Sequence, residues 1–118
     1  MKAWLHFAAV GTVLLAGASQ ANAAMSKEEG LALAKASGCL ACHSIDHKVV
    51  GPAWKDVSEK YKNEIDKVRP ILIKKVHTGG KGNWTKVTGG VPMPPYSPRV
   101  SDANIEKLVD FVLSLSKM

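Results

Sequence analysis

Apolar and polar positions alternate along most of this chain with the three- and four-residue spacing of helices that bury one face. The exception is the beginning, where Ala3 to Ala18 is almost continuously apolar. After residue 24 the apolar positions fall into several short segments separated by glycine and proline. This pattern predicts an all-α fold of four or five short helices, with one long loop before the last helix.

The first helix is predicted to run from Ser26 to Ala36. Ser26 and Glu29 have the spacing of a capping box, in which each side chain bonds the backbone N–H of the other residue. Gly38 is a plausible stop signal two residues beyond the last helical position. This helix therefore leads directly into the segment that begins at residue 39.

Two further helices are expected in the middle of the chain. Residues 53–62 can form a short helix with Trp54, Val57 and Tyr61 on one face. A longer helix begins at about Asp66 or Arg69 and ends at Thr78, because Pro70 is tolerated only near a helix start. Its apolar positions are Val68, Leu72 and Val76.

The segment 79–99 differs in composition from the rest of the chain. Its five glycines (79, 80, 82, 89 and 90) and four prolines (92, 94, 95 and 98) exclude a continuous helix. The last helix begins at Ser101-Asp102, and its apolar stripe consists of Ile105, Leu108, Val109 and Val112.

The apolar start of the chain has the form of a secretory signal peptide. Lys2 supplies a positive charge, an apolar run follows, and Ala21-Asn22-Ala23 provides a small-x-small cleavage pattern. The alternative is an uncleaved membrane anchor, but the run is short for a span of about 20 residues. We therefore expect residues 1–23 to be removed and residues 24–118 to form one domain of 95 residues in the periplasm.

The charges of the predicted domain are mixed, with 15 basic and 10 acidic residues. The basic residues are scattered from Lys27 to Lys117, whereas a nucleic-acid-binding protein concentrates them on one face. We expect no nucleic-acid partner. A net positive charge of this size can steer encounters with acidic proteins.

The strongest chemical signal is Cys39-Leu40-Ala41-Cys42-His43, which has the Cys-x-x-Cys-His form of c-type haem attachment. Cys39 and Cys42 can each form a thioether with one vinyl group of a haem, and His43 can then reach the iron. A thioredoxin-like pair belongs beside a strand–helix pattern. A structural zinc site needs four ligands. A disulfide between the two cysteines is possible, but it leaves His43 unexplained.

Haem iron has a second axial position, and Met93 is the favoured ligand for it. Prolines on both sides of Met93 restrict its backbone, which suits a loop that presents one thioether to a metal. Met25 and Met118 lie at the ends of the predicted domain. His77 and His47 remain as alternative ligands; His77 ends a helix and His47 is only four residues from His43.

Iron with both axial positions filled has no site for a substrate, and the weak thioether ligand raises its reduction potential. The sequence therefore favours a soluble one-electron carrier over an enzyme. Two alternatives remain: a haem subunit of a larger oxidoreductase, and a haem enzyme or gas sensor with a displaceable ligand.

With these residues placed, the chain resembles the short bacterial class I cytochromes c that donate electrons to nitrite reductase or terminal oxidases. The resemblance covers the whole predicted domain and is carried by 38–46, 50–57, 91–95 and the final helix. It implies that the Pro52 carbonyl accepts a hydrogen bond from His43 Nδ1 and that the Trp84 indole meets a haem propionate. It also implies that the first and last helices cross. Where these proteins often carry an Asn that bonds the Met sulfur, this chain has Tyr96.

The expected partners are redox proteins that dock weakly at an exposed haem edge on a monomer. The rim of that edge would be formed by the apolar residues Val49, Val50, Pro94 and Pro95, with lysines outside. A carrier must dissociate as readily as it binds, so we expect an interface of less than about 1,200 Å².

Overall fold

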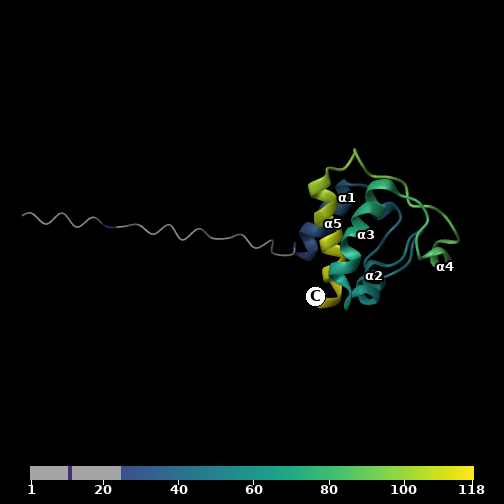
Figure 1. The fold of residues 1–118 in the computed structure, drawn as a ribbon, viewed down its shortest axis with the longest axis horizontal. Coiled ribbons are helices and arrows are strands. Elements are labelled where there is room, and N and C mark those ends of the chain that lie inside the picture. The colour runs from purple at the N-terminus through teal and green to yellow at the C-terminus, as the bar shows by residue number, and fades with distance from the viewer. Residues whose placement is uncertain (1–10, 12–24) are drawn as a thin grey trace, which may run out of the picture.

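Five α-helices and two short 3₁₀ helices make up the secondary structure of the described residues, which are residue 11 and residues 25–118 of a computed structural model (Figure 1). In chain order they are α1 (Lys27–Ala36), η1 (Cys39–Ala41), α2 (Trp54–Tyr61), α3 (Ile65–Thr78), α4 (Thr85–Thr88), α5 (Asp102–Ser114) and η2 (Leu115–Lys117). Pairing of β type within this part of the chain is limited to two isolated bridges. The predicted all-α class is confirmed.

The predicted signal peptide, residues 1–23, lies outside the described residues except for Gly11. Among the helices that are described, none has both the length and the apolar character needed to cross a bilayer.

The predicted start of α1 is confirmed, because both hydrogen bonds of the capping box are present. The backbone N–H of Glu29 donates to Ser26 Oγ (3.2 Å), and the backbone N–H of Ser26 donates to Glu29 Oε2 (3.1 Å). Beyond the helix, Gly38 has a φ of 82°, a left-handed conformation that glycine adopts without steric cost. The chain therefore turns sharply at Gly38 and enters η1 at Cys39.

Of the two predicted starts of α3, the one at about Asp66 agrees with the structure to within one residue, and the one at Arg69 is too late. The helix begins at Ile65, so Pro70 is its sixth residue rather than one of its first. A proline at this position cannot bond the carbonyl of Asp66 four residues earlier. Asp66 is exposed, so water can satisfy that carbonyl and the helix continues through the proline.

The central element of the fold is α5, which packs against α1, α2 and α3 (Figure 1). Its predicted stripe is confirmed, with Ile105, Leu108 and Val109 at most 5% exposed. The first and last helices approach each other closely at Gly30 and Phe111, as the resemblance implied. A Cβ at Gly30 would lie 2.2 Å from the Phe111 ring. Only glycine therefore permits this spacing between α1 and α5.

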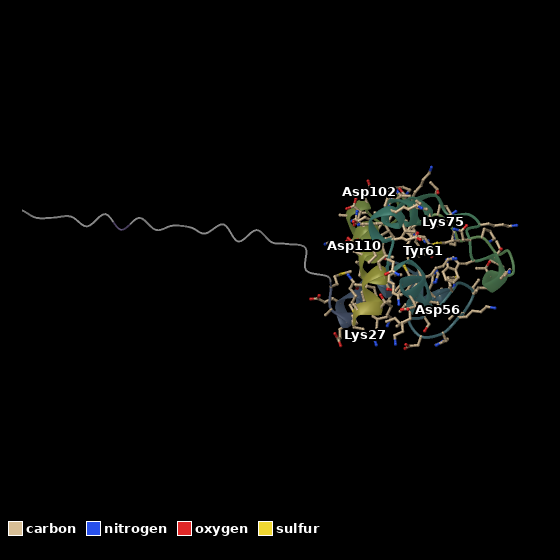
Figure 2. All side chains as sticks on the ribbon, turned by 60° about the horizontal axis from the view of Figure 1, so that its bottom comes forward. Lys27, Asp56, Tyr61, Lys75, Asp102 and Asp110 are labelled. Atoms are coloured by element: carbon tan, nitrogen blue, oxygen red, sulfur yellow. The ribbon has the colours of Figure 1, made fainter. Side chains whose placement is uncertain are left out.

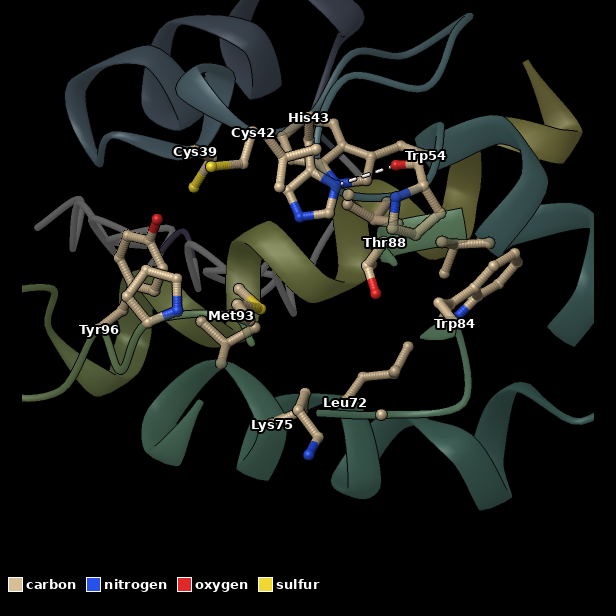
Figure 3. Close-up of a pocket in the computed structure, with 18 of the residues that line it drawn as sticks. Cys39, Cys42, His43, Trp54, Leu72, Lys75, Trp84, Thr88, Met93 and Tyr96 are labelled. Carbon is tan, nitrogen blue, oxygen red and sulfur yellow. Dashed lines mark hydrogen bonds between the residues drawn. The ribbon is translucent and has the colours of Figure 1, made fainter. Parts of the chain in front are cut away.

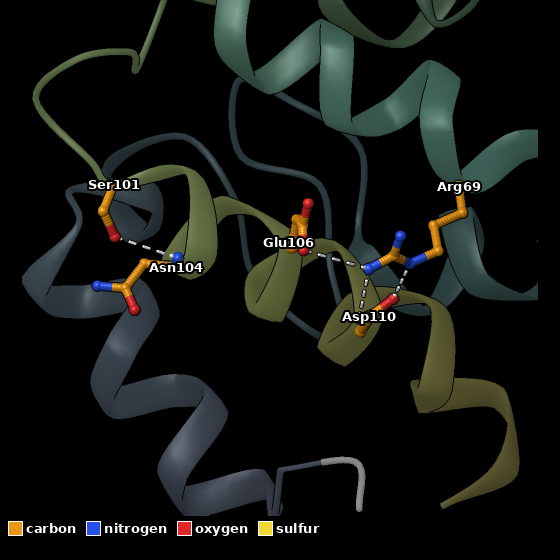
Figure 4. A network of polar contacts seen from close by, with 5 residues as sticks. All are labelled: Arg69, Ser101, Asn104, Glu106 and Asp110. Carbon is orange, nitrogen blue, oxygen red and sulfur yellow. Dashed lines mark hydrogen bonds and ion pairs between the residues drawn. The ribbon is translucent and has the colours of Figure 1, made fainter. Parts of the chain in front are cut away.

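Two polar contacts fix α2 and α3 to the C-terminal part of the chain. Ser58 on α2 is fully buried; its hydroxyl donates to the Leu113 carbonyl (2.8 Å) and accepts from the Ser116 backbone N–H (2.9 Å). On α3, the Arg69 guanidinium donates two hydrogen bonds to the carboxylate of Asp110 (2.6 and 3.0 Å; Figure 4). The hydrogen bonding to Asp110 raises the pKa of Arg69 further above its usual value; burial partly opposes this shift and the negative charge of Asp110 adds to it.

The segment between α3 and α5 contains no continuous helix, as predicted, but it does include the four-residue α4. Gly89 closes α4 in a left-handed conformation (φ 65°). Within the described part of the chain, Figure 1 shows α4 on the side opposite α5.

Candidate functional site

A cleft with about 1190 Å³ of empty space, part of it open to solvent, separates the segment 39–54 from α3 and the loop that follows it (Figure 3). The four residues predicted from the sequence all line this cleft: Cys39, Cys42, His43 and Met93. Most of the other lining residues are apolar. The apolar lining residues that come from α3 and α5 are Leu72, Val76, Leu108, Val109 and Val112. Leu72, Val76 and Val112 are only partly buried, because the sides of α3 and α5 that carry them border the cleft.

The two cysteines are brought to the same side of the chain by a single tight turn. The backbone N–H groups of Cys42 and His43 both donate to the Cys39 carbonyl (3.2 and 3.1 Å). Both thiols are free in the structure, which therefore does not contain the alternative disulfide between Cys39 and Cys42. Burial raises the pKa of Cys39, and the nearby charge of Arg99 partly opposes that shift.

His43 is oriented by its backbone surroundings. Its Nδ1 lies 2.9 Å from the Pro52 carbonyl oxygen and donates to it, because a carbonyl can only accept. The ring stacks on Trp54 with a centroid separation of 5.4 Å. Burial lowers the pKa of His43, with a smaller opposing effect of the bond to Pro52. The imidazole is thus held in the tautomer whose unprotonated nitrogen is Nε2, the form that binds metals.

Met93 approaches the cleft from the opposite side to His43 (Figure 3). Its backbone pairs with that of Gly80 in an isolated antiparallel bridge. Gly80 N–H donates to the Met93 carbonyl (2.8 Å) and Met93 N–H donates to the Gly80 carbonyl (3.2 Å). An imidazole and a thioether therefore border one apolar space.

The alternative axial ligands lie elsewhere. His77 Nε2 is 3.6 Å from an Asp102 carboxylate oxygen, and His47 Nδ1 is 3.2 Å from Ser44 Oγ. Neither histidine lines the cleft. Met118 is 58% exposed at the end of the chain.

Sequence reasoning missed Lys75, which lines the cleft from α3. Its ammonium donates to the carbonyls of Lys81 (2.9 Å) and Gly79 (3.5 Å). The helical register could have identified it, since position 75 shares a face with Leu72 and Val76. A cation at this place is suited to a ligand that carries carboxylates.

Trp84 and Tyr96 also line the cleft. The Trp84 ring lies 4.8 Å from the Lys60 ammonium, a cation–π contact between α2 and the loop. Tyr96 is 5% exposed and has the Arg99 guanidinium 4.8 Å from its ring centroid. Burial is the largest cause that raises the pKa of its hydroxyl.

The residues present fit a haem. A thiol pair, an imidazole and a thioether border one space whose other walls are mostly apolar, and Lys75 adds a positive charge. Gly51 leaves room for the imidazole, because a Cβ there would lie 2.4 Å from the His43 ring. By contrast, the described residues include no group of three or more His, Cys, Asp or Glu that could chelate a bare metal ion.

Comparison with known proteins defines the class. A family model described as Cytochrome c matches residues 27–116. The chain is 41% identical over 113 residues to cytochrome c-552 of Nitrosomonas europaea, with 96% of each chain covered. It is 42% identical over 115 residues to cytochrome c-552 of Hydrogenobacter thermophilus, covering 98% of this chain and 99% of the relative. The crystal structure of wild-type Nitrosomonas europaea cytochrome c552 aligns with a TM-score of 0.63 and 42% identity, over 72% of this chain and 98% of that one.

The chain therefore belongs to the cytochrome c family, and its similarity to bacterial cytochromes c-551 and c-552 makes it a class I cytochrome c. It carries a covalently bound haem c with iron and transfers electrons. Its relatives are electron-transfer proteins and not enzymes, so the haem-enzyme alternative is discarded. The sequence-based predictions of family, fold and cofactor are confirmed.

Proposed function

We propose that this chain is a one-electron carrier of the bacterial periplasm whose haem is held by Cys39, Cys42, His43 and Met93. It would pass electrons between a respiratory-chain donor and a terminal reductase or oxidase. The observation that supports this proposal best is the convergence of these four residues on one cleft, although Met93 is 50 residues from His43 in the sequence.

Each of the four residues has a separate task. Cys39 and Cys42 provide the sulfur atoms for two thioethers, and the turn between them brings both to one edge of the cleft. His43 would bind the iron through Nε2, with the Pro52 carbonyl holding the other ring nitrogen. Met93 presents its sulfur from the facing wall. A bound haem supplies an iron that gains or loses one electron.

The protein contributes the closed surroundings of this centre. With His43 and Met93 both bound to the iron, oxygen and other small ligands would be excluded. The thioether of Met93 is a weak donor that favours ferrous iron, so it raises the reduction potential. The ammonium of Lys75 is placed to balance the negative charge of the haem carboxylates.

The periplasmic location rests on the first 23 residues. A positive charge, an apolar run and a small-x-small motif form a signal peptide pattern. The relatives are bacterial proteins. Export can be tested by expression in a bacterial host that attaches c-type haem: the periplasmic product should begin at Ala24 and carry the added mass of one haem.

Redox partners would dock at the mouth of the cleft. Val50 (39% exposed) and the exposed Pro94 line it, and Val49 (42% exposed) precedes Val50 in the chain. Shallow apolar contact of this kind permits rapid dissociation, in agreement with the small interface expected for a carrier.

The distribution of charge favours acidic partners on this side. Between Asp66 and Asp102 the chain has seven basic residues and no acidic one, whereas residues 25–66 and 102–118 together have eight basic and ten acidic residues. In Figure 2, Asp102 and Asp110 lie along α5 and Lys75 extends on the side of α4. Even without Arg69, which pairs with Asp110, the α3 and loop segment carries an excess of positive charge, and this charge would accelerate the approach of an acidic surface.

The ligation is tested by Met93→Ala in the haem-loaded protein. The variant should lose the ferric methionine–iron charge-transfer band and have a lower reduction potential. Met118→Ala is the matched control, because Met118 is exposed at the chain end, and it should leave both unchanged. An unaltered spectrum in Met93→Ala would remove Met93 from the site.

A further inference from the structure

The end of α3 and the loop that carries Met93 are joined by four backbone hydrogen bonds. They run from Gly80 N to Met93 O (2.8 Å), Met93 N to Gly80 O (3.2 Å), Tyr96 N to Val76 O (3.0 Å) and Ser97 N to His77 O (3.4 Å). The carbonyls of the last four residues of a helix have no partner within the helix. In α3 two of those carbonyls, at Val76 and His77, accept hydrogen bonds from backbone N–H groups of the loop that carries Met93.

Gly79 makes this close pairing possible. Its backbone has φ 67° and ψ −159°, a conformation that is essentially restricted to glycine. A Cβ at this position would lie 2.4 Å from the Met93 carbonyl oxygen and 2.7 Å from the Pro95 backbone nitrogen. Any side chain here would therefore push the loop away from α3.

We propose that the C-terminal end of α3, with Gly79, is a template that sets the position of Met93 independently of the iron. In this account Gly79 is a positioning residue: it does not line the cleft, and it acts through the backbone of Met93. This inference rests on the proposed ligation by Met93. The backbone pairing holds the loop in place before the weak thioether–iron bond forms.

The opposite account is that the iron–sulfur bond holds the loop and that the hydrogen bonds follow from it. Hydrogen exchange of the ferrous Met93→Ala protein distinguishes the two, since the amide at position 93 is retained. The template predicts that the amides of Gly80, residue 93 and Tyr96 keep their protection to within about tenfold of wild type. Exchange at these three amides as fast as at exposed loop amides would overturn the template.

A second experiment compares Gly79→Ala with Gly89→Ala. Gly89 also has a positive φ (65°), but a Cβ there would have no atom within 4 Å. Gly79→Ala should weaken the methionine–iron band, lower the reduction potential and let added imidazole bind at least about tenfold more tightly, because the competing methionine is less often in place. Gly89→Ala should match wild type in all three. If Gly79→Ala matches wild type as well, the template is wrong.

The outcomes separate this inference from the ligation on which it rests. If Met93→Ala keeps the band, Met93 is not the ligand and both proposals fail. If Met93→Ala loses both the band and the amide protection, the ligation stands and the template fails. If Gly79→Ala does not yield haem-loaded protein, the exchange result in Met93→Ala decides.

Discussion

The His43 imidazole lies directly against the backbone of Gly51: a Cβ at Gly51 would be 2.4 Å from ring carbon Cε1 and 2.8 Å from Nδ1. The neighbouring Pro52 carbonyl accepts the hydrogen bond from that same nitrogen. One dipeptide therefore both makes room for the ring and fixes its tautomer. Orientation of a metal-binding histidine by such a partner strengthens and directs its ligation.

Gly51→Ala tests this relationship. The φ of Gly51 is outside the left-handed region, so alanine is acceptable to the backbone and the variant isolates the contact with the ring. We expect a lower yield of haem-loaded protein and a loss of about 1–3 kcal/mol in the free energy of unfolding, as for other overpacked sites. Haem staining of purified protein and denaturant titration measure the two effects.

Gly82→Ala is the matched control, because its Cβ would only reach ordinary contact with Lys75 Cε at 3.7 Å. Equal behaviour of the two variants would contradict the role assigned to Gly51.

The crossing of α1 and α5 leads to a second prediction. Gly30→Ala gains about 1 kcal/mol of helix propensity, but its methyl group would overlap the Phe111 ring. We expect a net loss of stability by thermal or denaturant unfolding, because overpacking costs about 1–3 kcal/mol. In the double variant Gly30→Ala/Phe111→Leu the smaller residue makes room, so the two changes should be non-additive by at least about 0.5 kcal/mol. Simple additivity would show that the two residues do not constrain the crossing.

The buried hydroxyl of Ser58 leads to a third prediction. Ser58→Ala removes a donor to the Leu113 carbonyl and an acceptor for the Ser116 N–H. Leaving buried polar groups unpaired costs about 1–3 kcal/mol, so the free energy of unfolding should fall by that amount. Ser116→Ala is the contrasting control, because Ser116 Oγ is buried without a hydrogen-bond partner among the described residues. That variant should be neutral or stabilising, and a larger loss from Ser116→Ala than from Ser58→Ala would contradict both assignments.

A fourth prediction concerns pH. The Lys55 ammonium lies 2.7 Å from Asp46 Oδ1 and, through this hydrogen bond and its charge, lowers the pKa of Asp46. A lowered folded-state pKa contributes stability above the unfolded value, and that contribution disappears as the pH falls through the folded value. Asp46→Asn should therefore be slightly less stable than wild type at pH 7 and equal to it in strong acid.

The pair is exposed, so salt should also reduce the difference at pH 7. Denaturant titrations at both pH values and at two salt concentrations measure it. A difference that grows as the pH falls would contradict the assignment.

Local signals in the sequence predicted several elements correctly. The capping box at Ser26 and the cap at Ser101, which accepts from the Asn104 N–H, depend on residues three positions apart and need no tertiary contact. The alternative start of α3 at Arg69 was wrong, because the local rule that places proline near a helix start does not include the solvent exposure of the carbonyl that Pro70 leaves unpaired. The short helix α4 was missed, since four residues between glycines are too few for a periodic pattern.

The sequence predicted only those residues of the site that belong to a short sequence motif. The haem-attachment motif led to the prediction of Cys39, Cys42 and His43, the flanking prolines led to that of Met93, and all four line the cleft. Lys75 was not identified, because one lysine among many becomes significant only when the side of α3 that carries it is known to border the cleft.

Taken alone, the sequence determined the helical class, the kind of prosthetic group and four residues that line the cleft, because attachment motifs and caps are read over a few adjacent positions. Tertiary structure decided how those residues meet. The pairing of Gly80 with Met93 and the fit of Gly30 against Phe111 join positions 13 and 81 residues apart. Contacts over such separations depend on how whole helices pack, and no local pattern of residues specifies that packing.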